Sequence, residues 1–86
     1  MNPVNELHPS DNLRLVSIIR IIRPPYYGYH VTYHYDDRMI SMDYDQSDVA
    51  FVNGITELLL NAGWVEKPVI IGGVEYPGAK SYERPV

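Results

Sequence analysis

Cysteine is absent from this 86-residue sequence, which excludes disulfide bonds, cysteine zinc sites, iron–sulfur clusters and thiol catalysis. Small secreted domains usually rely on disulfides, so we expect a cytoplasmic protein. The first residues show no basic region followed by an apolar run, and we expect no signal peptide. Long apolar runs are also missing. The densest, residues 13–22, contains two arginines and a serine and is far shorter than the roughly 20 residues of a membrane span.

Basic residues are few, with seven lysines and arginines against 11 aspartates and glutamates and a net charge of −4. The imbalance is concentrated in residues 36–66, which contain seven acidic residues and a single basic one, Arg38. This distribution disfavours nucleic-acid binding through a basic surface. We therefore expect direct contact with neither nucleic acid nor membrane.

The length predicts a single domain spanning residues 1–86, with an irregular arm at 1–12 and an extended tail at 77–86. A chain of this size buries only about 60–65% of its unfolded surface, which leaves little room for a deep substrate pocket. None of the five serines lies in a nucleophile-elbow context. We expect no enzymatic activity, no catalytic residues and no cofactor.

The segment Leu13–Arg23 is dense in β-branched residues and predicts a strand, with a helix beginning near Ser10 as the alternative. Pro24-Pro25 ends it, because proline cannot donate ladder hydrogen bonds. Simple alternation predicts two apolar sets on opposite faces. They are Leu13, Leu15, Ile19 and Ile21 on one face, and Val16, Ile18 and Ile22 on the other.

Residues 27–44 carry the clearest pattern, a β-hairpin with a tyrosine-rich apolar face and a polar, acidic face. Asp36-Asp37 suits the turn. Placing these two residues at the turn pairs Tyr33 with Ile40, Val31 with Met42, Tyr29 with Tyr44, His34 with Met39, Thr32 with Ser41 and His30 with Asp43. Both strands then assign their apolar residues to the same face, which a one-residue slip would destroy.

Residues 47–62 predict a helix with Ser47 as its N-cap and Asp48 in its first turn. Gly54 suggests close approach to the sheet. Gly63 has the residue type of a helix C-terminal cap, with Trp64 packing back on Leu59. The apolar stripe consists of Phe51, Val52, Ile55, Leu58, Leu59 and Ala62.

Residues 69–71 predict a last short strand, which Gly72-Gly73 turns into a small hairpin with residues 74–76, and Pro77-Gly78 ends the regular structure. We expect the 69–71 strand, or a second copy of the chain, to cover the edge of Leu13–Arg23. The predicted class is α+β: a small two-layer domain with a three-stranded antiparallel meander in β-β-β-α-β order, packed by one helix over the tyrosines, with a short C-terminal strand or hairpin.

Metal binding is not expected from the histidines or aspartates. His30 and His34, four residues apart on a strand, are separated by roughly 13 Å, too far to share a metal ion. Asp43, Asp45 and Asp48 lack the glycine and the distant glutamate of a calcium loop.

The leading functional hypothesis is a protein partner with a basic surface, bound through an acidic patch. The patch consists of Asp36, Asp37, Asp43, Asp45 and Asp48. Compact cysteine-free domains with an acidic face are typical of phage or mobile-element inhibitors of host nucleic-acid-handling or defence machinery, anti-CRISPR proteins among them.

Two other hypotheses remain open. One is a nucleotide or small-ligand binding protein of the sponge type, in which aromatic rings on a sheet face stack on the ligand. Its candidate residues are Tyr27, Tyr29, Tyr33, Tyr35, His30 and His34. The other is a structural homodimer formed through the Leu13–Arg23 edge.

Overall fold

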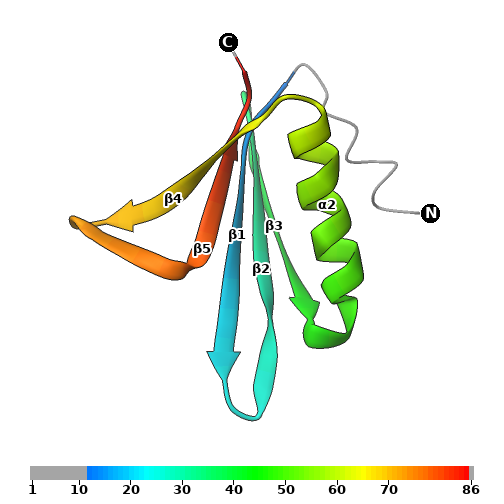
Figure 1. The fold of residues 1–86 in the computed structure, drawn as a ribbon, viewed down its shortest axis with the longest axis vertical. Helices are drawn as coiled ribbons and strands as arrows, with labels where there is room; N and C mark the ends of the chain where they lie inside the picture. The colour runs from blue at the N-terminus through cyan, green and yellow to red at the C-terminus, as the bar shows by residue number, and fades with distance from the viewer. Residues whose placement is uncertain (1–11, 86) are drawn as a thin grey trace.

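The computed structural model describes residues 12–85, which form a five-stranded antiparallel sheet and one α-helix (Figure 1). The elements are β1 (Leu13–Arg23), β2 (Tyr26–Tyr35), β3 (Met39–Asp45), the 3₁₀ turn η1 (Gln46–Asp48), α2 (Val49–Asn61), β4 (Val65–Ile71) and β5 (Val74–Glu83). The predicted α+β class and element order are confirmed, with a larger sheet than predicted. The irregular arm predicted at 1–12 lies, apart from Asn12, outside the described residues. No helix between residues 12 and 85 is long and apolar enough to cross a membrane.

The β2–β3 hairpin has the predicted register. His30 faces Asp43, Val31 faces Met42 and Tyr33 faces Ile40, among seven registered pairs. The turn is closed by a hydrogen bond of 2.8 Å from the Tyr35 amide to the Arg38 carbonyl. The alternation of the two strands therefore specifies both the hairpin and its register.

Strand β1 lies at the centre of the sheet and contains a β-bulge at its start. Leu13 pairs with Tyr35, but Leu15 already pairs with His34, so Arg14 is an extra residue. The bulge turns Leu13 onto the face of Val16, where it is buried. The predicted placement of Leu13 on the face of Leu15 is therefore wrong, because the bulge at Arg14 interrupts the simple alternation.

The C-terminal hairpin is longer than predicted and is ordered differently in the sheet. The sheet order is β3-β2-β1-β5-β4, so β5 pairs with β1 and β4 forms the outer edge. The expectation that 69–71 would lie beside β1 is wrong, as is the end of regular structure at Pro77-Gly78. Strand β5 continues through these residues because Ala79 and Tyr82 beyond them are buried beside β1.

The helix ends as predicted but begins differently. Gly63 has a positive φ of 89°, and the Trp64 amide donates to the Leu59 carbonyl at 3.0 Å, as in a Schellman motif. The predicted Ser47 N-cap is wrong, because residues 46–48 form η1 and the Asp45 carboxylate accepts from Ser47. The suggested close approach at Gly54 is also wrong, since a Cβ there would meet no atom within 4 Å.

Helix α2 covers the tyrosine-bearing face of the sheet, as predicted. One core contains side chains from this face, from the helix and from the segment after it. Its members are Leu13, Val16, Ile18, Val31, Tyr33, Tyr44, Val52, Ile55, Leu59, Trp64 and Tyr82. The opposite face, called the open face here, carries Leu15, Ser17, Ile19, His30, Thr32, His34, Ser41, Asp43, Ser81 and Glu83. The helix thus leaves the polar face of the hairpin uncovered.

Candidate functional site

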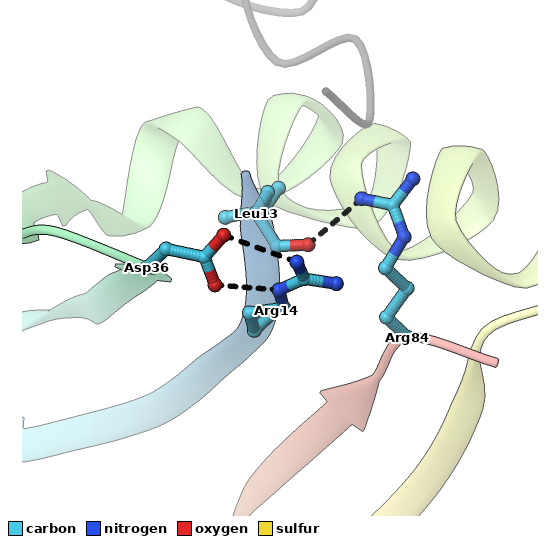
Figure 2. Close-up of polar contacts among 4 residues, drawn as sticks. All are labelled: Leu13, Arg14, Asp36 and Arg84. Atoms are coloured by element: carbon cyan, nitrogen blue, oxygen red, sulfur yellow. Dashed lines mark hydrogen bonds and ion pairs between the residues drawn. The ribbon is translucent and has the colours of Figure 1, made fainter. Parts of the chain in front are cut away.

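Asp36, the first aspartate of the predicted acidic patch, is held in a bidentate ion pair with Arg14 (Figure 2). Arg14 Nε donates to Asp36 Oδ1 at 2.6 Å, and Arg14 Nη2 donates to Oδ2 at 3.0 Å. These bonds favour the ionised form and hold the pKa of the Asp36 carboxyl below its usual value. The charge of Asp36 is therefore largely compensated within the chain.

A second arginine attaches β5 to the same end of β1. Arg84 Nη1 donates to the Leu13 carbonyl at 3.0 Å (Figure 2), and the Arg84 amide donates to the Arg14 carbonyl at 3.1 Å. The first residues of β1 are therefore held from both sides, by Asp36 and by Arg84. No sequence pattern pointed to these contacts, because the partners are 22 and about 70 residues apart.

Asp43 lies on the open face and pairs with His30, as the predicted register requires. His30 Nδ1 and Asp43 Oδ1 are 2.6 Å apart, and both side chains are partly exposed. Beside them, the hydroxyl oxygens of Thr32 and Ser41 are 3.2 Å apart. This row of cross-strand polar pairs follows the hairpin across its uncovered side.

Asp45 and Asp48 lie where β3 passes into the helix. The Asp45 carboxylate accepts hydrogen bonds from the Ser47 amide at 3.0 Å and from the Ser47 hydroxyl at 2.8 Å. These bonds hold the pKa of the Asp45 carboxyl below its usual value, and the bond from the Ser47 amide has the larger effect. Asp48 is exposed at the start of α2 and makes no side-chain capping bond.

The five aspartates do not form a single cluster. Asp36 and Asp37 lie beyond the first end of β3, whereas Asp45 and Asp48 lie at its other end. The six residue steps of β3 at about 3.3 Å each separate these ends by roughly 20 Å. Asp43 lies between them on the open face, and Asp37 Oδ2 lies 3.5 Å from Arg38 Nη1. The acidic residues therefore follow one outer strand from end to end.

The tyrosines proposed as a ligand platform serve mainly as core. Tyr33 is 2% exposed, its hydroxyl lies 3.4 Å from that of Tyr44, and burial raises the pKa of Tyr33. Tyr29 and Tyr35 are half-buried, and each ring lies under a guanidinium group. The Arg20 group is 6.0 Å from the Tyr29 ring centroid, and the Arg38 group is 4.7 Å from the Tyr35 ring centroid. Tyr27 differs from these three tyrosines, because it is 41% exposed and not a member of the core.

The histidines proposed for the same ligand lie on the other side of the sheet. His30 and His34 project from the open face, opposite the tyrosines. The structure therefore does not bring the two sets together. Within residues 12–85 there is no pocket, and no group of three histidine, aspartate or glutamate side chains is placed to hold a metal ion.

Comparisons with models of protein families, with curated proteins and with solved structures found no match.

Proposed function

We propose that this chain is a small, non-enzymatic cytoplasmic binding protein that engages a basic protein partner through β3 and the residues at its two ends. The observation that carries the proposal is the distribution of exposed acids along this outer strand. Asp37, Asp43, Asp45 and Asp48 are all exposed there, and Arg38 is the single basic residue of segment 36–48. This group of four is called the acidic edge below.

The acidic edge retains a negative field despite its local hydrogen bonds. Asp45 accepts bonds from Ser47, a neutral partner, so its carboxylate remains charged. Asp36 is left out of the edge, because the bidentate bond to Arg14 compensates its charge. A field of this kind steers a basic partner toward the strand and weakens as salt shortens the Debye length.

The spacing of the acids constrains the form of the partner. The two ends of β3 are roughly 20 Å apart, about twice the Debye length of 8–10 Å at physiological salt. A single basic side chain cannot neutralise both ends. The expected partner therefore carries several lysines or arginines along an extended surface, such as the nucleic-acid-binding groove of another protein.

Charge reversal tests the acidic edge. The triple variant Asp37→Lys, Asp43→Lys, Asp48→Lys spares both Asp36 and the Ser47-capping Asp45. Glu57→Lys, on the exposed side of α2, is the control for charge reversal outside the acidic edge. In affinity capture, the wild type and the control should both retain a basic protein, and the triple variant should fail to retain it. The affinity of the purified complex should fall by more than tenfold between 0.1 and 0.5 M salt. Equal capture by the triple variant would refute the acidic edge as the binding site.

Inhibition of host defence is the specific activity we propose for such a binder. Its support is the type of molecule: a cysteine-free domain with an acidic edge and no pocket among residues 12–85. Expression in a panel of bacterial strains, each with one active CRISPR–Cas system, should raise phage plating efficiency in at least one strain. The triple variant should lose this effect while Glu57→Lys keeps it. An unchanged plating efficiency across the panel would count against the anti-CRISPR activity but not against the binding.

A further inference from the structure

The end of the β4–β5 hairpin, residues 69–77, projects away from the rest of the sheet (Figure 1). It is called the projecting hairpin below. Pro68 pairs with Lys80, whereas Ile70 pairs with Glu75, so five residue steps on β5 correspond to two on β4. The extra residues bend the hairpin away from β1. Beyond the bend, Gly72 and Gly73 form its two-residue turn with φ of 58° and 80°.

The projecting hairpin is apolar and uncovered. The exposed fractions are 61% for Ile70, 58% for Ile71, 60% for Val74 and 48% for Tyr76. Glu75 is its only charged residue. Two strands alone are marginally stable in water, and an exposed apolar hairpin of this kind marks an interaction site.

The bend leaves part of β1 without a neighbour on one side. Pairing of β1 with β5 ends at Ile19 with Ala79, while β1 itself continues to Arg23. Gly78 still lies against Arg20, since a Cβ on this glycine would be 3.5 Å from the Arg20 Cβ. Within the part of the chain that the structure describes, residues 21–23 are therefore paired only with β2. They present a free strand edge that carries Arg23 and Ile22, which is 64% exposed.

Chemically, the projecting hairpin fits this free edge. Continuing the β1–β5 register one residue at a time from Ile19 and Ala79 would place Tyr76 opposite Ile22 and Glu75 opposite Arg23. The first is an aromatic–aliphatic pair and the second an acid–base pair, both of which stabilise antiparallel strands. The bend prevents the hairpin from reaching the edge of its own chain in this register.

We infer that a second copy of this chain supplies the missing strand, so that two copies exchange their projecting hairpins. Residues 75–77 of one copy pair with residues 21–23 of the other, and a two-fold axis repeats the contact reciprocally. Two observations select a second copy as the partner: the opposite charges of Glu75 on the hairpin and Arg23 on the edge, and the bend. The pairs that the continued register would form agree with both. The acidic edge remains free, because β3 and β4 lie at opposite sides of the sheet.

Mass measurement tests the association directly. Light scattering after gel filtration should show a concentration-dependent dimer of twice the 9.9 kDa chain. Tyr76→Ser should shift the protein to monomer, because it removes the side chain placed opposite Ile22 of the other copy. Leu60→Ser, on α2 at 44% exposed against 48% for Tyr76, should leave the dimer intact. A monomer at millimolar concentration would overturn the inference.

Cross-linking tests which residues meet. Because the chain lacks cysteine, Arg23→Cys and Glu75→Cys each introduce a unique thiol. Mixing the two single variants under oxidising conditions should give a disulfide-linked dimer more efficiently than either variant alone. Equal yields from the mixture and from the separate variants would exclude the exchange.

Charge exchange completes the test. Glu75→Arg and Arg23→Glu should each weaken the dimer by about tenfold, since each places like charges opposite one another. The double variant should recover most of the affinity. Failure of the double variant to recover would show that these two residues do not face each other. None of these results depends on the acidic edge, so this inference and the proposed function stand or fall separately.

Discussion

Arg14 and Asp36 join the beginning of β1 to the residue after β2 through two hydrogen bonds. Arg14 is also the extra residue of the bulge that turns Leu13 into the core. The ion pair and the bulge therefore act at the same residue. Loss of the pair should loosen the end of the strand from which Leu13 projects.

The first prediction concerns acid stability. The pKa of Asp36 is lowered in the folded protein, so its ionised form favours folding. This contribution is complete above the ordinary value of 3.8 and is lost as pH falls through the lower folded-state pKa. Asp36→Asn should therefore destabilise the protein at pH 7 and flatten the loss of stability on acidification. Thermal unfolding followed by Trp64 fluorescence from pH 7 to pH 2.5 measures both effects.

Asp37→Asn is the control for this experiment, because it removes a negative charge at the adjacent position without breaking the bidentate pair of Arg14 and Asp36. Some acid dependence should remain in Asp36→Asn, since the pKa of Asp45 is also lowered. Combining Asp36→Asn with Asp45→Asn should flatten the profile further. A steeper acid transition in Asp36→Asn would contradict the stabilising role of the ion pair.

The second prediction concerns Gly28, which is buried in β2. A methyl group at this position would collide with the backbone carbonyl oxygen of Tyr44 on β3. Backbone cannot rotate out of the way as a side chain does, so Gly28→Ala should force the strands apart. We expect a loss of about 1–3 kcal/mol in the free energy of unfolding. Urea denaturation measures it, and an unchanged midpoint would show that the hairpin tolerates the methyl group.

The third prediction concerns Gly54 and has the opposite sign. This glycine lies inside α2, and an added Cβ would meet nothing within 4 Å. Glycine in a helix interior costs about 0.5–1 kcal/mol relative to alanine. Gly54→Ala should therefore stabilise the protein by about that amount in the same urea assay. A destabilised variant would mean that Gly54 has a role outside the contacts described.

The fourth prediction compares neighbouring leucines of α2. Leu59 is 1% exposed in the core, whereas Leu60 is 44% exposed. Leu59→Ala should cost about 2–5 kcal/mol, because it removes buried methyl groups and leaves a cavity. Leu60→Ala should cost well under 1 kcal/mol. Similar losses in the free energy of unfolding at the two positions would show that the core does not lie on the side of α2 that carries Leu59.

Local patterns predict the parts of this fold that repeat without interruption. The β2–β3 register follows from two alternations that agree, and the Schellman motif follows from Gly63 after an apolar helix. The bulge at Arg14 has no such pattern, because a single extra residue does not change the composition of the strand. The sequence predicts that regular structure ends at Pro77-Gly78, because this pair is typical of turns. In the structure it marks a bend within strand β5.

The candidate site was predictable to a similar degree. The His30–Asp43 contact follows from the register, so it is visible in the sequence. The compensation of Asp36 by Arg14 depends on the bulge and on tertiary structure. The exposure of the projecting hairpin cannot be predicted from the sequence either. Its apolar residues resemble those of a core strand, and only the bend in the structure shows that they are uncovered.

The bond between Arg84 and Arg14 has a mechanical consequence. The start of β1 and the end of β5 are adjacent and antiparallel, so both lie at one end of the sheet (Figure 1). A force applied to Leu13 and Arg84 would open this bond first and then each β1–β5 pair in turn. Strands loaded in this geometry unzip sequentially instead of sharing the load. Pulled from these two points, the sheet should open at low force, however stable it is toward heat or denaturant.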